Sequence, residues 1–133
     1  MPDIQKISLA QYRLEKAKET YQTAMDNLAG SKYLDANNRA YYSIFHSIRA
    51  VLALDGVDFK RHSGVISYFR EKYIKTGLFS VEYSDIIGKA SIIRGKSDYE
   101  DFYITTREEA QEQIDNAKLF YDVVSDYISS AMA

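Results

Sequence analysis

The only proline of this chain, Pro2, is the sequence feature that most restricts its fold. Proline breaks helices because its ring fixes φ and removes an N–H donor, so no later helix is interrupted in this way. Glycines at positions 30, 56, 77 and 95 each follow a segment with helical hydrophobic periodicity, where a C-terminal cap favours glycine. No stretch alternates with period two. The sequence therefore predicts no sheet and five helices, at about 8–29, 31–55, 63–75, 81–95 and 106–130.

The first and last of these segments carry the same stripe of apolar residues. The spacing is 4-3-4-3-4 in both, with members Ala10, Leu14, Ala17, Tyr21, Ala24 and Leu28, and Ala110, Ile114, Ala117, Tyr121, Val124 and Ile128. A 3.5-residue period keeps one seam toward a partner helix, and small residues allow close approach. Thr106 and Glu109 form a plausible capping box for the last helix. The prediction is an all-α, up-and-down four-helix bundle with an additional short helix, in a single domain over residues 1–133.

Composition excludes several classes of function. The chain has no cysteine, which removes disulfides, iron–sulfur clusters and thiolate zinc sites. Its 17 Lys+Arg and 19 Asp+Glu give a net charge of −2, so nucleic acid could be bound only through a local basic patch. The two histidines lie sixteen residues apart and make a poor metal set, so neither a metal nor another cofactor is expected. A secretion signal and a membrane-spanning run are both missing, which predicts a cytoplasmic protein without membrane contact.

The second predicted helix holds the first candidate site. Leu34, Tyr41, Ile44, Phe45, Ile48 and Leu52 form its apolar face, and the opposite side carries Asp35, Arg39, Tyr42, His46 and Arg49. Arg39 and His46 are seven residues apart and point the same way. In metal-free RNA cleavage, a histidine can move a proton while an arginine neutralises the phosphate. The alternative is a solvated polar face, with Asp35 and Arg39 as an ordinary ion pair.

Two further clusters are candidates for phosphate recognition. Arg94 lies at the edge of the apolar stripe of the fourth helix, with Asp98 four residues later. Asp98 could hold Arg94 toward a phosphate while Tyr99 stacks on a base, or the pair could simply fix the following loop. The segment Lys60, Arg61, His62 precedes the third helix and could form an anion site, although Ser63 could equally be a plain N-cap.

Four ordered motifs resemble the HEPN domain family, in particular its small stand-alone bacterial and archaeal branch. They are NRAYYSIFHSIRAVLAL (38–54), KRHSGVISYF (60–69), KTGLF (75–79) and RGKSDYEDF (94–102), and YRLEKAKET (12–20) fits as well. The resemblance covers nearly the whole chain. It implies a helical bundle that forms a homodimer or a complex with a small nucleotidyltransferase of the MNT type, often as a toxin–antitoxin pair.

The resemblance also implies a possible activity. Many HEPN proteins are metal-independent endoribonucleases whose signature is an arginine followed, after four to six residues, by a histidine. Here Arg94 matches the arginine, but the segment after it contains no histidine. Arg39 and His46 fit the spacing on another helix.

Two functions therefore stay open. In the first, the protein binds RNA or nucleotides, and if it also cleaves RNA, the catalytic centre is Arg39, His46 and Arg94. Binding would then involve a wider set of side chains, namely Tyr42, Asp98, Tyr99, Lys60, Arg61 and His62. In the second, it is a non-catalytic dimerising module that docks a nucleotidyltransferase. The first function requires Arg94 and His46 to face a common cleft.

Overall fold

The computed structural model describes residues 3–132. The helices are α1 (Ile4–Ala29), α2 (Tyr33–Asp55), α3 (His62–Phe69), α4 (Val81–Tyr99) and α5 (Arg107–Met132), and a short π-helix, η1 (Arg70–Ile74), continues α3. These described residues contain no strand. The predicted all-α bundle of four long helices and one short helix is confirmed.

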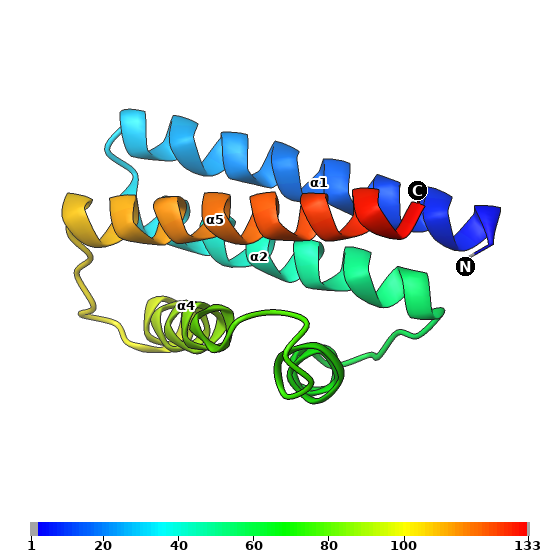
Figure 1. Ribbon diagram of the computed structural model, residues 1–133. Coiled ribbons are helices and arrows are strands. Elements are labelled where there is room, and N and C mark those ends of the chain that lie inside the picture. Colours follow the sequence, from blue (N-terminus) through cyan, green and yellow to red (C-terminus); the bar gives the residue numbers. More distant parts are fainter. Residues whose placement is uncertain (1–2, 133) are drawn as a thin grey trace.

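The three longest helices form the body of the molecule (Figure 1). α1 runs antiparallel to α2 and α5, and α2 packs extensively on both of them. α3 and α4 are seen nearly end-on in the same view, so they cross the direction of the long helices. They pack on the side of α2 that α1 and α5 leave open. This crossing brings residues of α2, α3 and α4 together.

Small residues let α1 and α2 approach closely. Ala36, Ala40, Ala50 and Ala53 of α2 are all buried, as are the alanines at positions 10, 17 and 24 of α1. The buried Ser43 hydroxyl donates to the Ala17 carbonyl oxygen at 2.8 Å, which satisfies a polar group at the contact. The members of the predicted stripes of α1 and α5 are buried, except for the half-buried Leu14, Tyr21 and Tyr121. Leu34 was expected on the apolar face of α2 but is 39% exposed, because it lies in the first turn of α2.

Two helix boundaries, the start of α1 and the end of α4, differ from the sequence prediction by four residues. α1 begins at Ile4 because the Asp3 carboxylate caps it, accepting a hydrogen bond from the Lys6 N–H at 2.9 Å. α4 does not end at Gly95 but continues to Tyr99, and the Ser97 hydroxyl donates to the Ile93 carbonyl oxygen across this added turn. The predicted C-cap at Gly95 is therefore wrong. Its consequence is that Asp98 lies one helical turn from Arg94.

The connection from α2 to α3 sets the position of the candidate site. Gly56 closes α2 in the left-handed region with φ 71°, as its sequence position predicted. α3 then begins at His62, one residue before the alternative N-cap Ser63, and Arg61 occupies the cap position without a side-chain hydrogen bond. In η1 the Lys75 N–H bonds to the Arg70 carbonyl oxygen at 2.8 Å, a π-type turn.

Candidate nucleic-acid-binding site

Arg94 of α4 is held against two tyrosines of α2. Its Nη2 donates to the Tyr42 hydroxyl at 3.1 Å, and its guanidinium carbon lies 4.9 Å from the ring centre of Tyr41 and 5.4 Å from that of Tyr42. Such contacts attract a cation to the aromatic face. Asp98 Oδ2 lies 3.5 Å from Arg94 Nε. Although partial burial disfavours its charge, Tyr42, Tyr41 and Asp98 together raise the pKa of Arg94, which stays fully charged.

The guanidinium of Arg94 lines a cavity of about 490 Å³ between α2, α3 and α4. Its wall consists of Tyr41, His62, Ser63, Ile66, Ser67, Arg70, Gly88, Ser91, Ile92 and Arg94. Two of these residues are arginines and none is acidic. Serine hydroxyls supply neutral hydrogen-bonding groups on α3 and α4. The cavity therefore favours a small anion or the phosphate of a larger ligand.

His62 shares this cavity with Arg94. Its Nδ1 lies 2.9 Å from the Tyr41 hydroxyl, and its ring stacks on Phe45 with 4.0 Å between the ring centres. The Tyr41 contact occupies one ring nitrogen and leaves Nε2 for a ligand. Burial lowers the pKa of His62, and the positive charges of Arg94 and Arg49 lower it further. The imidazole is therefore neutral at pH 7 and can accept a proton.

His46 lies behind Tyr42 and does not line the cavity. The ring centres of Tyr42 and His46 are 6.3 Å apart, and the Arg39 guanidinium carbon lies 5.0 Å from the Tyr42 ring centre. Burial lowers the pKa of His46 to about 4, and Lys16, Arg49, Arg39 and His62 add repulsion. Its Nδ1 is buried without a hydrogen-bond partner among the described residues.

Arg94 and His46, which were expected to face a common cleft, do not line the same cavity. Tyr42 connects the two groups, since it accepts from Arg94 and packs beside His46. The cavity itself brings Arg94 together with His62 instead.

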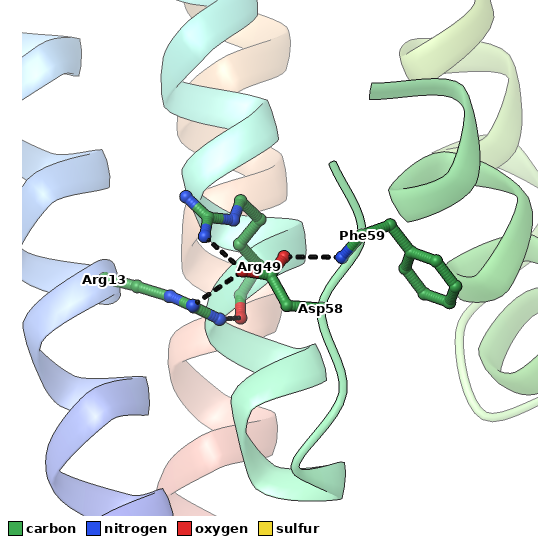
Figure 2. A network of polar contacts seen from close by, with 4 residues as sticks. All are labelled: Arg13, Arg49, Asp58 and Phe59. Carbon is green, nitrogen blue, oxygen red and sulfur yellow. Dashed lines mark hydrogen bonds and ion pairs between the residues drawn. The ribbon is translucent and has the colours of Figure 1, made fainter. Parts of the chain in front are cut away.

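Arg49 is the cation that lies near both histidines, and Asp58 fixes it (Figure 2). Asp58 Oδ2 accepts from Arg49 Nη2 at 2.7 Å and from Arg13 Nη2 at 3.3 Å, while Oδ1 accepts from the Phe59 N–H. Arg13 also donates through Nη1 to the Arg49 carbonyl oxygen at 3.0 Å. One carboxylate thereby joins α1, α2 and the loop before α3. Burial acts to raise the pKa of Asp58, but the hydrogen bonds and charge of Arg49 lower it overall.

The other predicted binding residues lie outside the cavity wall. Tyr99 is 85% exposed at the end of α4. Lys60 and Arg61 are exposed in the loop before α3, next to His62. Their positions allow contacts with a ligand that extends beyond the cavity.

Arg70 and Tyr41 complete the cavity wall, and sequence reasoning did not single them out as site residues. Tyr41 belongs to the apolar face of α2, as its pattern indicates, and its ring and hydroxyl both contact His62. Arg70 Nε donates to the Ser84 hydroxyl at 3.0 Å and Nη2 to the Ser84 carbonyl oxygen at 3.1 Å. This contact depends on the packing of η1 against α4 and leaves no local signal in the sequence.

The predicted capping box of α5 forms only in part. The Glu109 N–H donates to the Thr106 hydroxyl at 3.1 Å. The Glu109 carboxylate turns to the hydroxyls of Tyr103 and Thr105 and to the Asn37 amide. It therefore ties the loop before α5 to α2.

No helix within residues 3–132 is long and apolar enough to cross a membrane. The same stretch contains no group of three or more His, Asp or Glu side chains that could hold a metal ion.

Comparison with known proteins identifies the family. The sequence profile of the HEPN domain matches residues 10–127, and the chain therefore belongs to the HEPN domain family. Two similar proteins come from Methanocaldococcus jannaschii. "Putative toxin MJ0142" is 32% identical over 118 residues, which cover 88% of this chain and 80% of that protein. "Putative toxin MJ0605" is 37% identical over 115 residues, covering 81% and 85%. A UPF0332 protein of Thermotoga maritima is 27% identical over 124 residues, covering 93% and 94%.

Proposed function

We propose that this HEPN protein is the toxin of a toxin–antitoxin pair and acts by binding RNA in the cavity between α2, α3 and α4. The names of the two Methanocaldococcus relatives support the first part. The second part rests on one observation: Arg94 and Arg70 line a cavity whose wall contains no carboxylate. A chain with a net charge of −2 needs such a local site to hold a polyanion.

Within this proposal each side chain has a defined role. Arg94, fixed by Tyr41 and Tyr42, contacts a phosphate oxygen, and Arg70 contacts the same or the next phosphate. Tyr99, at the exposed end of α4, stacks on a base beyond the cavity.

The proposal includes a catalytic step, in which the protein cleaves the RNA that it binds. In such a reaction a base takes the proton of the ribose 2′-hydroxyl, and the 2′-oxygen attacks phosphorus to form a 2′,3′-cyclic phosphate. The bond between phosphorus and the 5′-oxygen breaks, and this oxygen takes a proton from water. His62 is the favoured base because its neutral imidazole lines the cavity with Arg94, whereas His46 does not. His46 stays a second candidate, since it is connected to Arg94 through Tyr42.

The test measures binding and cleavage separately. Purified protein is titrated into a labelled 12-nucleotide RNA, comparing wild type with Arg94→Gln and with the control Arg107→Gln. Arg107 lines a different cavity, on α5, together with Glu108, Glu112 and Asp115. We expect Arg94→Gln to weaken binding at least tenfold and Arg107→Gln to leave it within twofold. Equal affinities for all three proteins, or no binding by wild type, would contradict the proposal.

Cleavage is then followed on the same RNA in the presence of a chelator. We expect activity to be lost in His62→Ala and retained in His46→Ala, with both proteins folded by circular dichroism. The reverse pattern assigns the proton transfer to His46. RNA binding by wild type without cleavage removes the nuclease step and leaves the binding function.

A second candidate function, docking of a protein partner, is supported by exposed apolar side chains around the end of α4. Tyr99 is 85% exposed, Phe102 95% and Ile104 85%. Such a group of exposed side chains is typical of an interaction surface. We propose that it binds the antitoxin, a small nucleotidyltransferase, since a toxin needs a protein that restrains it. Phe102→Glu together with Ile104→Glu should abolish co-purification of a co-expressed small nucleotidyltransferase of the MNT type. Unchanged co-purification would show that the antitoxin does not bind at the exposed side chains around the end of α4.

A further inference from the structure

A second cavity, of about 560 Å³, lies on the other flank of α4. The first cavity is bounded by α2 and α3, whereas this one reaches Tyr103 in the loop before α5 and Glu109 of α5. The two cavities share three lining residues, Arg70, Gly88 and Ile92. They therefore meet on the outer surface of α4.

Arg70 marks the place where they meet. Its guanidinium extends from η1 and donates to the hydroxyl and the carbonyl oxygen of Ser84, which are both neutral. None of the ion pairs found within residues 3–132 involves Arg70. Arginine keeps its charge at all physiological pH values. A fixed cation without a counterion thus stands between the two cavities.

Gly88 has no side chain to cover the surface of α4 beside Arg70. Its backbone φ is not in the positive range that requires glycine, so the helix itself does not need glycine here. A Cβ at position 88 would lie 3.4 Å from Arg70 Nη2, so a larger side chain would displace the guanidinium or cover it. The absent side chain therefore leaves Arg70 open to a ligand that crosses the helix.

The second cavity continues the line of positive charge. Lys89 and Lys96 of α4 line it together with Arg70, against the carboxylates of Asp85 and Glu109. Lys89 also pairs with Glu112, and Glu109 is occupied by Tyr103 and Thr105. The cations along this path are, in order, Arg94, Arg70, and Lys89 with Lys96.

Apolar surface accompanies these cations. Ile92, shared by both cavities, is 62% exposed, and the Tyr103 ring lines the second cavity. Unpaired bases need such surfaces for stacking, whereas the bases of a duplex are already stacked. Each nucleotide of a single strand also carries one phosphate charge, which suits cations spaced along a path.

We infer that the two cavities form one binding surface for single-stranded RNA, which crosses α4 at Gly88 and places a phosphate on Arg70. The inference rests on the proposed RNA-binding function and specifies its substrate class. A ligand of two nucleotides occupies the first cavity alone, whereas a longer strand uses both cavities.

The test compares the two glycines inside the described part of α4. Gly88→Leu places a large side chain at the point on α4 where the two cavities meet. Gly95→Leu is the matched control, because it places leucine in the same helix and a Cβ at position 95 meets nothing within 4 Å. Gly95 lines neither cavity. The ligands are the dinucleotide pUpU, measured by calorimetry, and a 12-nucleotide oligouridylate, measured by fluorescence anisotropy.

We expect Gly88→Leu to bind the 12-mer at least tenfold more weakly and to lose less affinity for pUpU, because Gly88 lines both cavities whereas pUpU occupies only the first. Gly95→Leu should bind both ligands like wild type. As an independent measurement, Arg70→Gln should reduce the slope of log affinity against log salt by about 0.7 for the 12-mer, the value for one phosphate contact on a single strand. The control substitution Lys118→Gln, on α5, should leave the slope for the 12-mer unchanged.

The outcomes separate this inference from the proposed function. If wild type and Gly88→Leu bind the 12-mer equally, or if both leucine variants lose affinity alike, the crossing is wrong while RNA binding stands. If wild type binds neither ligand, the proposed function and the inference both fail.

Discussion

Arg94 Nη2 donates to the Tyr42 hydroxyl at 3.1 Å, and this hydrogen bond joins α4 to α2 across 52 residues of sequence. The guanidinium is thereby fixed in a cavity wall before any ligand arrives. A group that is already ordered loses little further entropy on binding, so the contact favours recognition as well as stability.

The first prediction concerns the planarity of Arg94. Arg94→Lys keeps the charge but loses the flat contact with Tyr41 and Tyr42, so we expect 12-mer RNA affinity to fall about tenfold, or about 1.4 kcal/mol. Tyr42→Phe keeps the ring and removes only the hydroxyl, which should cost about 1 kcal/mol in the free energy of unfolding. Anisotropy and urea denaturation measure the two effects. RNA affinity as high in Arg94→Lys as in wild type would show that charge alone is sufficient.

The second prediction concerns His46 and pH. Its pKa is about 4 in the folded protein against about 6.5 when unfolded, so between these values the unfolded state binds more protons. The free energy of unfolding must therefore fall as pH decreases from 6.5 to 4, by at most about 3 kcal/mol from this residue. His46→Asn removes the titration while leaving the carboxylates in place.

Urea denaturation of both proteins at pH 7.5, 5.5 and 4 tests this expectation. Wild type should lose more stability than His46→Asn over the range, since titration of the carboxylates is common to both. A constant difference between the two proteins at all three pH values would mean that His46 has an ordinary pKa.

The helices of this protein could be predicted from sequence because their signals are local. The 4-3-4-3-4 stripe that includes Ala17 and Ala117 depends on one helix at a time, and both residues are buried as the stripe predicts. Gly56 ends α2 for an equally local reason, since its φ of 71° suits glycine.

Two members of the cavity wall, Arg94 of α4 and His62 of α3, could be predicted as site residues from the sequence. Arg94 was found from its position at the edge of an apolar stripe, and His62 from a short basic segment. Their shared cavity depends on the angle at which α3 and α4 cross α2, which hydrophobic periodicity does not encode. Arg70 was missed for the same reason, because its partner Ser84 lies in another element.

The third prediction concerns Asp58, whose carboxylate joins Arg13 and Arg49 (Figure 2). Asp58→Asn leaves Arg13, only 9% exposed, without its charged partner. Loss of one partner of a buried pair destabilises by several kcal/mol, but the Asp58 side chain is 44% exposed, so we expect about 1–2 kcal/mol. Urea denaturation measures the change. Glu71→Gln, which breaks an exposed pair with Lys75, is the control and should change stability by less than about 0.5 kcal/mol.

The same substitution has a consequence for the site. Without Asp58, Arg49 is free to move toward the histidines whose pKa values it already lowers. The pKa of His62, followed by the NMR shifts of its ring protons, should therefore change in Asp58→Asn and stay unchanged in Glu71→Gln. An unchanged pKa in both variants would show that Arg49 is held in place by other contacts.

The fourth prediction concerns Gly95, for which the sequence pattern predicted the wrong position in its helix. Gly95 was expected to end a helix but lies inside α4 without a positive φ, and a Cβ there meets nothing within 4 Å. Gly95→Ala should therefore stabilise the protein by up to about 1 kcal/mol, because alanine loses less backbone entropy in a helix. Gly77→Ala should instead destabilise it by about 1 kcal/mol, since Gly77 has a φ of 83°. Thermal unfolding of the two variants should shift the midpoint in opposite directions. A lower midpoint for Gly95→Ala would mean that α4 ends at residue 95, and Asp98 would then lose its position one turn from Arg94.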